Sequence, residues 1–256
     1  MGTSHAISGA AAWVAISSTA VPALGWYPLD GVGVIAGAIV AAGAALLPDA
    51  DHPSATIAHS IPGGSAITGA LGAASGGHRK GMHSLLAVLV VTVGAWVASV
   101  LRVTPEGWDR PLQLGAAVSI IACVCFALKA MKLVRTWPKA WLGGLIAAAA
   151  LIWILPDGIA WFPWAIGSGY LVHLLGDFLT TGGVPWLWPW MPKPPQHLRK
   201  SWLINVWRPY GGFAAPVLGN AGSYREWLLT IPLAGYTLWG LAMGVTTLPE
   251  LLPLAL

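Results

Sequence analysis

Long apolar stretches separated by short polar segments run along the whole chain. Seven of these stretches contain no Asp, Glu, Lys or Arg, and they cover residues 6–29, 31–48, 82–101, 111–128, 140–156, 158–176 and 227–249. Each is 17 to 24 residues long, and a helix needs about 20 apolar residues to cross the hydrocarbon layer of a bilayer. The pattern predicts seven membrane-spanning helices, with a tilted or partial span as the alternative for 140–156, the shortest stretch.

The composition supports this interpretation. Only 9% of the 256 residues are charged and 56% are hydrophobic, whereas about 25% of a typical soluble domain is charged. A soluble enzyme of this size could not cover its surface with so few charges, and a disordered chain would contain far fewer apolar residues. Because no internal repeat divides the chain, we expect one membrane-embedded, all-α helical bundle over residues 1–256.

The Lys and Arg residues are distributed unequally between the loops. If the N-terminus is cytoplasmic, 11 of the 13 basic residues fall in cytoplasmic segments, and only Arg102 and Arg110 fall outside. Basic residues favour the cytoplasmic side of membrane spans. We therefore predict a cytoplasmic N-terminus, a cytoplasmic loop at 193–225 and a final span at 227–249. The net charge of +4 then reflects topology, and we expect no nucleic-acid partner, since the basic residues lie beside the spans.

Three local features refine this prediction. The first 25 residues resemble a signal peptide but lack a basic n-region, which predicts an uncleaved first span. Residues 54–77 are rich in Ser, Gly and Ala, so we expect a flexible or re-entrant loop there. Gly33 and Gly37 form a GxxxG motif in the second span, which favours close packing against another helix.

Histidine and aspartate side chains gather in four short motifs. These motifs are His5 alone; Asp49, Asp51 and His52; His78 and His83; and His173 with Asp177. In the predicted topology all four lie at the cytoplasmic ends of their spans, although the histidines played no part in setting that topology. The convergence predicts one site, built from segments that are far apart in the sequence.

The chemistry of these side chains is that of metal ligands. His173 and Asp177 are four residues apart on a predicted helix, so both lie on one face and can bind the same ion. Mixed imidazole and carboxylate ligands suit Zn²⁺, Mn²⁺ or Fe²⁺ better than Mg²⁺ or Ca²⁺, which prefer oxygen ligands. We therefore expect a divalent metal cofactor, with Zn²⁺ as the first candidate and Mn²⁺ or Fe²⁺ as alternatives.

Each motif alone has a structural explanation, such as a solvated loop at Asp49 or a buried pair at His173. Ionisable groups in membrane proteins are costly and usually functional, so a set of eight at one membrane face favours a functional site. His59 and His197 have no such neighbours, and we expect them on the surface. Arg79 lies between two candidate ligands, where its guanidinium can hold an oxyanion, although a purely topological role stays open.

The order of these motifs resembles that of the YdjM family of bacterial inner-membrane proteins, which is described as a family of metal-dependent hydrolases. The resemblance covers residues 3–190 and rests on His5, LLPDADHP, HRKGMHS and HLLGDFLTTGGVPWLWP, while residues 193–256 match none of its motifs. The family looks distantly similar to zinc-dependent phospholipase C and P1-type nucleases, which are helical enzymes that cleave phosphoesters with metals bound by His and Asp. This likeness implies metal ligands at His5, Asp49, Asp51, His52, His78, His83, His173 and Asp177.

The leading hypothesis is a membrane-embedded, metal-dependent hydrolase whose site lies at the cytoplasmic interface. Asp51 and Arg79 are the predicted catalytic residues: Asp51, or Asp49, orients or deprotonates a water molecule, and Arg79 neutralises a phosphoryl oxygen. A site at headgroup depth predicts a phospholipid or another amphiphilic phosphoester as substrate, in contact with the bilayer.

Two other functions are compatible with the same residues. A metal-ion transporter or metal sensor would use the same ligands, but transport sites usually lie near the bilayer midplane rather than at one face. A scaffold with a structural metal would need a closed shell of four ligands, and the motifs offer eight.

Overall fold

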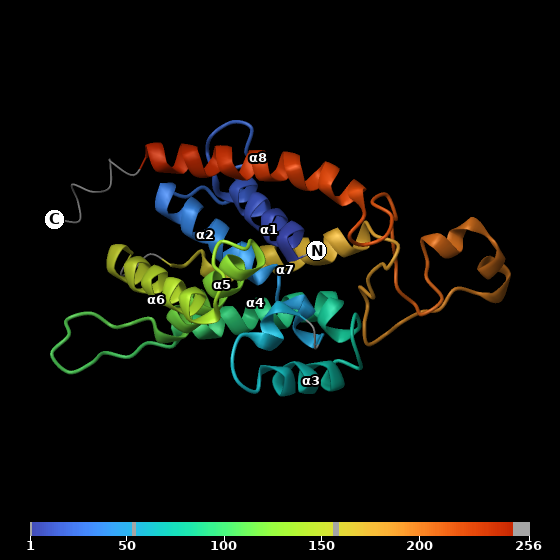
Figure 1. Ribbon diagram of the computed structural model, residues 1–256, viewed down its shortest axis with the longest axis horizontal. Helices are drawn as coiled ribbons and strands as arrows, with labels where there is room; N and C mark the ends of the chain where they lie inside the picture. The colour runs from blue at the N-terminus through green and yellow to red at the C-terminus, as the bar shows by residue number, and fades with distance from the viewer. Residues whose placement is uncertain (1, 53–54, 156–158, 248–256) are drawn as a thin grey trace.

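The computed structural model describes residues 2–52, 55–155 and 159–247. Within these residues the chain forms eight α-helices and no strands, with only isolated bridges between extended residues (Figure 1). The helices are α1 (Gly2–Ser17), α2 (Gly31–Ala44), α3 (Gly64–Ala74), α4 (Leu85–Val100), α5 (Leu114–Ala130), α6 (Trp137–Ile154), α7 (Phe162–Phe178) and α8 (Tyr224–Thr246). The expectation of an all-α protein is confirmed.

Each of the seven charge-free stretches contains most of one helix, although α5, α6, α7 and α8 extend past these stretches over charged residues at one end. Three helical segments are long and apolar enough to cross a membrane, namely Gly31–Asp51, Trp137–Ile154 and Tyr224–Thr246. Helices α4 and α5 are apolar but shorter. Residues 156, 158, 248 and 249, at the ends of predicted spans, lie outside the described part of the chain.

The first predicted span, 6–29, is helical only as far as Ser17. The chain after it contains Pro22, Gly25 and Pro28 and forms turns, with Gly25 at a φ of +61°. Proline removes a backbone donor and glycine adopts a positive φ without strain, so neither favours a continuing helix. The first helix is therefore shorter than the charge-free stretch that contains it.

The segment 54–77, predicted as a flexible or re-entrant loop, instead contains helix α3. This helix begins after Gly63, whose φ is +78°, and its Ala and Leu residues are good helix formers. It packs against η1 (Pro48–Asp51), the 3-10 turn that follows α2. A Cβ on Gly72 would lie 2.9 Å from the carbonyl oxygen of Asp51, so the glycine permits this close packing.

Helices α1, α2 and α7 form the centre of the bundle. Helix α2 packs against α1, α5, α7 and α8, and α1 also contacts α7 and α8. Small residues allow the backbones to approach: a Cβ on Gly9 of α1 would lie 2.5 Å from the carbonyl oxygen of Ala41 in α2. Gly169 of α7 packs against the same carbonyl group. Ala41 is thus the point where all three central helices meet.

The predicted packing role of the GxxxG motif is confirmed by Trp13 of α1. Its indole ring lies against Gly37, where any Cβ would collide with it. The indole Nε1 donates a hydrogen bond of 3.1 Å to the carbonyl of Gly33. Gly37 therefore makes room for this fully buried tryptophan, and Gly33 binds it through its backbone carbonyl.

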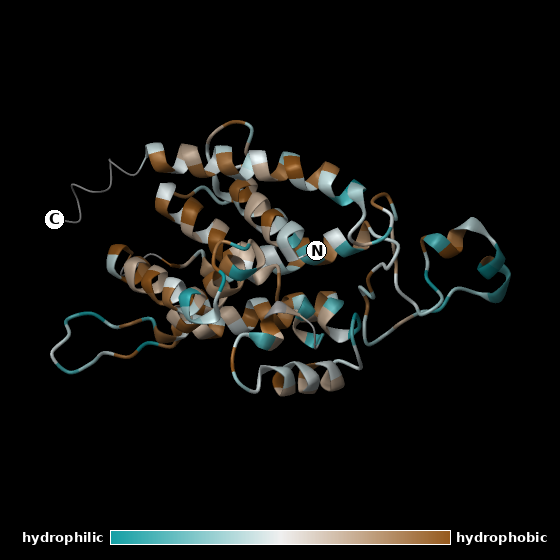
Figure 2. Ribbon diagram, viewed as in Figure 1, coloured by the Kyte–Doolittle hydropathy of each residue, from teal (hydrophilic) through white to brown (hydrophobic). Residues whose placement is uncertain are grey.

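The outward faces of α4, α6 and α8 are apolar. Large exposed hydrophobic side chains cover them, among them Leu89, Val93 and Trp96 on α4, Leu142, Leu145 and Ile146 on α6, and Leu228, Ile231 and Leu238 on α8. Figure 2 shows hydrophobic residues along these helices and most hydrophilic residues in the loops and at helix ends. Soluble monomers rarely expose so much apolar surface, and it suits the hydrocarbon of a bilayer.

Candidate metal centre

Four segments meet at one end of the bundle. Helix α1 begins there, η1 follows the end of α2, η3 (Gly81–His83) leads into α4, and α7 ends beside them. Consecutive helices run back and forth, so the start of α1 and the end of α7 return to the same end (Figure 1). The side chains brought together are those of His5, Asp49, His83, His173 and Asp177.

His5, His173 and Asp177 form the first of two overlapping groups. The rings of His5 and His173 stack with their centroids 3.9 Å apart. His5 Nε2 lies 3.7 Å from Asp177 Oδ1, and His173 Nε2 lies 3.8 Å from Asp177 Oδ2. All three residues are buried. The predicted i, i+4 pair of α7 thus meets a third candidate ligand from the first turns of α1.

Asp49, His83 and His173 form the second group. Asp49 Oδ1 lies 3.7 Å from His83 Nε2 and 3.8 Å from His173 Nε2. His83 Nε2 also lies 3.5 Å from Asp177 Oδ2, which links the two groups. The side chain of Asp49 is 31% exposed, whereas that of His83 is fully buried. Asp49 therefore lies on the open side of the cluster.

One hydrogen bond fixes how His173 faces the other residues. Its Nδ1 lies 2.7 Å from the carbonyl oxygen of Ala45, which accepts hydrogen bonds only. Nδ1 must therefore carry the proton, and the lone pair of Nε2 points into the cluster. Metal-ligating histidines are typically oriented in this way by a backbone carbonyl or carboxylate. Because His173 has one free nitrogen and belongs to both groups, an ion bound by both groups would contact it through Nε2 alone.

Several polar atoms of the cluster have no hydrogen-bond partner among the residues that the structure describes. They are both ring nitrogens of His83, Nε2 of His173 and Oδ2 of Asp177. A buried polar atom left without a partner costs about 1–3 kcal/mol. Asp177 Oδ2 forms an ion pair with Arg79, so the three imidazole nitrogens are the atoms that need an explanation. A cation bound between them would satisfy most of these atoms.

The distances in the cluster fit that explanation. A tetrahedral ion with bonds of about 2.1 Å holds its ligand atoms about 3.4 Å apart. The separations of 3.5 to 3.8 Å between nitrogens and carboxylate oxygens are close to this value. The donor set of three imidazoles and two carboxylates suits Zn²⁺, Mn²⁺ or Fe²⁺. These residues can therefore hold a divalent metal ion.

Asp51 and His78 lie behind this cluster. His78 Nδ1 is 2.8 Å from Asp51 Oδ1, and the backbone N–H of Arg79 donates to Asp51 Oδ2 over 3.2 Å. Asp51 Oδ2 is also 3.8 Å from Nδ1 of His83. The ring of His52 packs edge-on against His78, with centroids 4.5 Å apart. Asp51, His52 and His78 are outside both three-residue groups found in the described chain, and their role as direct ligands stays a prediction.

Arg79 connects Asp51 with Asp177, one of the candidate metal ligands. Its Nη2 lies 3.2 Å from Asp177 Oδ1 and 3.1 Å from Oδ2. The residue adopts a left-handed φ of +56°, which is uncommon for a residue with a side chain. The bond from its own N–H to Asp51 stabilises this conformation. The side chain is 25% exposed, so the guanidinium reaches from solvent to a buried carboxylate.

Two residues at the cluster were not predicted from the sequence. In the loop between α7 and α8, Arg208 Nη2 donates to the carbonyl of Thr181, and Tyr210 OH donates to the carbonyl of Gly182 over 2.6 Å. Burial raises the pKa of Tyr210, so the phenol stays protonated and remains a donor. The surrounding loop is irregular and rich in Pro and Gly, and single Arg and Tyr residues in it have no spacing that would identify them.

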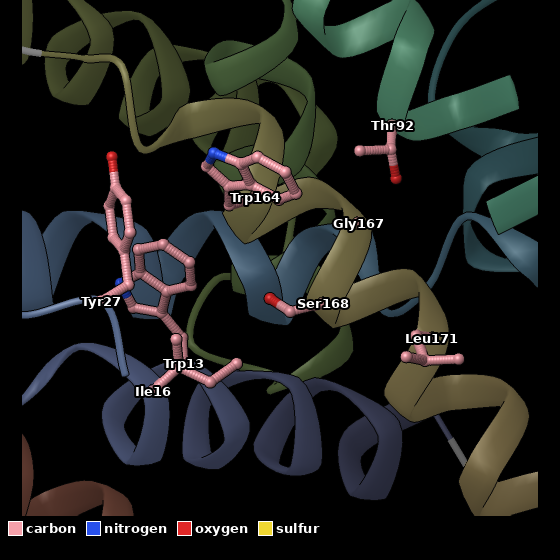
Figure 3. A pocket seen from close by; sticks show the side chains of 8 residues that line it. All are labelled: Trp13, Ile16, Tyr27, Thr92, Trp164, Gly167, Ser168 and Leu171. Atoms are coloured by element: carbon pink, nitrogen blue, oxygen red, sulfur yellow. The ribbon is translucent and has the colours of Figure 1, made fainter. Parts of the chain in front are cut away.

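The predicted surface histidines and an apolar pocket lie apart from the cluster. His59 and His197 are exposed, as expected. A pocket of about 470 Å³ opens between α1, α4 and α7 and is almost entirely apolar. Trp13, Tyr27, Trp164 and their neighbours surround it in Figure 3. None of the predicted site residues lines this pocket, so the sequence motifs point to the metal cluster alone.

The comparison with known proteins agrees with this arrangement. Residues 1–247 match a family described as the YdjM inner membrane protein. No curated protein and no solved structure matches the chain. The match covers all the segments that build the cluster, together with the loop that carries Arg208 and Tyr210, and its description agrees with the apolar helices. The chain therefore belongs to the YdjM family of inner membrane proteins, whose location is the bacterial inner membrane.

Proposed function

We propose that the protein is an integral-membrane, metal-dependent hydrolase that cleaves a phosphoester of a lipid or another amphiphile at the cytoplasmic interface. The observation that carries the proposal is a cluster of imidazole and carboxylate groups in which three buried imidazole nitrogens, two on His83 and one on His173, have no hydrogen-bond partner in the described chain. Unpaired buried groups are costly, so a protein retains them where they bind something. Their donor set indicates a divalent metal.

We assign different roles to the residues of the two three-residue groups and to Asp51, which lies outside both groups. A divalent ion held by His5, His173 and Asp177, with Asp49 and His83, would act as a Lewis acid and lower the pKa of a water molecule. Asp49 is the partly exposed carboxylate of this set, and we assign to it the role of orienting that water. Asp51 is bonded to His78 and to the N–H of Arg79, which suits a positioning role.

The surroundings of the site support an amphiphilic substrate. The cluster lies where α1 and α4 begin and α7 ends, next to the apolar faces that suit lipid. In the predicted topology this end is cytoplasmic, because most basic residues lie in its loops. A phosphoester at headgroup depth would present its charged group to Arg79 while its apolar part stays in the bilayer.

The transporter alternative requires a polar path from the cluster to the opposite end of the bundle. Among the described residues, about two or more turns farther along α1 and α7, the core contains the buried hydrophobic side chains of Trp13, Ile166 and Phe162. The His and Asp residues that could bind an ion gather at one end of the bundle instead. A purely structural metal is also disfavoured, because Asp49 and His78 leave that end partly open to solvent.

The proposal is tested on protein purified in detergent. Metal analysis is combined with a panel of phosphoesters that includes short-chain phospholipids and water-soluble phosphomonoesters. We expect at least about one divalent ion per chain. We also expect hydrolysis that a chelator abolishes and that added Zn²⁺ or Mn²⁺ restores. Metal-bound protein that moves ions across proteoliposomes and cleaves no member of the panel would contradict the hydrolase and support the transporter.

A further inference from the structure

The loop between α7 and α8 brings a second arginine to the metal centre. Arg208 is bonded to the carbonyl of Thr181, and Tyr210 is bonded to the carbonyl of Gly182. Thr181 and Gly182 come shortly after the end of α7, four and five residues beyond Asp177. The two bonds therefore fix Arg208 and Tyr210 beside the end of the helix that carries two of the candidate ligands.

Arg79 meets the same stretch of backbone. Its guanidinium packs against Gly182, where any Cβ would collide with Nη1, and it pairs with Asp177. The charges of both Arg208 and Arg79 lower the pKa of Tyr210, against the larger opposing effect of burial. Both guanidiniums thus contact the backbone of Thr181 and Gly182, the stretch to which Tyr210 is also bonded. A glycine at position 182 is what allows Arg79 to come so near.

The hydrogen-bonding capacity of Arg208 is only partly used. Its Nη2 is bonded to Thr181, but its Nε is buried and has no partner among the described residues. A buried N–H gains from an acceptor. Guanidinium groups present planar, parallel donors that match the oxygens of a phosphate. An oxyanion at the mouth of the cluster would supply the missing acceptor.

The formal charge of the centre also favours an anion. Asp49, Asp51 and Asp177 carry three negative charges, which a divalent ion and Arg79 together would balance. Arg208 then leaves the mouth of the site positive. Charges in a partly buried site act more strongly than in water, and a positive cleft concentrates anionic ligands.

We propose that Arg208 and Arg79 form a clamp for the phosphate group of the substrate, with Tyr210 positioning the backbone between them. This inference rests on the proposed function and deepens it, because it names a phosphate held by two arginines as the recognised group. The competing explanation is that Arg208 only fastens the loop to Thr181.

The test measures binding of inorganic phosphate to the metal-loaded, full-length protein in a maltoside detergent, by equilibrium dialysis. We expect Arg208→Ala to raise the Kd for phosphate about 10-fold or more, and Arg208→Lys to recover only part of the loss, because an ammonium cannot form the bidentate contact. The matched control is Arg199→Ala, which removes an exposed arginine of the same loop and should leave the Kd unchanged.

Arg208→Gln separates the clamp from a fastening role. Glutamine keeps a donor for Thr181 but loses the charge, so the clamp predicts phosphate binding as weak as that of Arg208→Ala, with unchanged metal content and thermal unfolding. Wild-type affinity for phosphate in Arg208→Gln, or an equal loss in Arg199→Ala, would overturn the clamp. If Arg208→Ala does not fold, the Gln and Lys variants decide the question by themselves.

Competition identifies the source of the phosphate. Displacement of bound phosphate by dihexanoyl phosphatidic acid at lower concentration than by glycerol 3-phosphate supports the clamp as a site for a lipid headgroup. Equal displacement supports it as a site for a water-soluble phosphoester, and displacement by neither overturns it. The binding test does not depend on turnover, so the two proposals can fail separately. A protein that hydrolyses no phosphoester contradicts the proposed function, whereas phosphate binding that does not depend on Arg208 contradicts the clamp.

Discussion

His173 illustrates how a single residue is prepared for its role. Its position on α7 places it over Asp177, and the carbonyl of Ala45 holds its Nδ1 proton. The remaining nitrogen faces Asp49 and Asp177 without a hydrogen-bond partner in the described chain. Orientation by a second group of this kind is typical of metal-binding histidines. A residue held in this way loses little entropy when an ion binds.

Replacing His173 or Asp177 with Ala should remove the bound metal. Each substitution deletes one side chain that both links the two groups and reaches the other ligand candidates. Even an indirect partner of a metal ligand contributes about 10–100-fold in affinity, so we expect a loss of at least about 100-fold, measured by elemental analysis after dialysis. His59→Ala, an exposed histidine outside the cluster, is the control. Full metal occupancy in a folded His173→Ala protein would contradict the assignment.

Arg79 tests chemistry separately from metal binding. Arg79→Ala should retain bound metal and reduce turnover by about 100-fold or more, because a preorganised charge next to the reacting group is lost. Arg79→Lys should restore only part of the activity. Turnover is measured on the first active phosphoester, with Lys80→Ala as the neighbouring control. If Arg79→Ala loses its metal, the pairing with Asp177 serves to hold that ligand rather than the substrate.

At the scale of helices, the site depends on how closely α1, α2 and α7 approach one another. Gly9 and Gly169 both pack against the carbonyl of Ala41, and this contact fixes the spacing between α1 and α7. His5 is one turn before Gly9, and His173 is one turn after Gly169. A change in the helix contact is therefore transmitted directly to the metal ligands.

Gly169→Ala should lower both the thermal stability and the metal affinity. The new Cβ would overlap the Ala41 carbonyl, and overpacking of this kind costs about 1–3 kcal/mol. Gly94→Ala is the matched control, because Gly94 also lies inside a helix but has open space around it. There the substitution should be neutral or stabilising by about 0.5–1 kcal/mol. Equal thermal midpoints for the two variants would show that the close contact is unimportant.

At the scale of the whole molecule, one end carries the cluster and the other end carries the loop with Arg102, Glu106 and Arg110. The loop 101–113 joins α4 to α5 and is exposed over most of its length. The apolar faces of α4, α6 and α8 lie between the two ends. The end with the cluster contains most of the Lys and Arg residues, and we therefore predict that this end faces the cytoplasm.

Cysteine labelling tests this orientation. We expect a membrane-impermeant reagent added to intact spheroplasts to modify Glu106→Cys and to leave Gly69→Cys unmodified. Both positions are exposed and Gly69 has open space around it, so accessibility within the protein is not limiting. The native Cys123 and Cys125 are buried and should not react. After permeabilisation both sites should react, and labelling of Gly69→Cys in intact spheroplasts would reverse or disprove the topology.

The sequence by itself determined the helical architecture and most members of the cluster. Charge-free stretches identified the seven long helices, because a chain this poor in charge must satisfy its backbone inside helices when it lies in lipid. The four His and Asp motifs could be assigned to one end, since the direction of each helix follows from their order. The i, i+4 pair of His173 and Asp177 required only the helical repeat.

The tertiary structure decided which residues touch. The sequence treated eight His and Asp residues alike, and only the fold separates His5, Asp49, His83, His173 and Asp177 from Asp51, His52 and His78 behind them. It also revealed Arg208 and Tyr210, whose place depends on how an irregular loop folds back onto Thr181 and Gly182. Periodicity describes contacts along one helix, but contacts between distant segments depend on packing and loop geometry that no local pattern encodes.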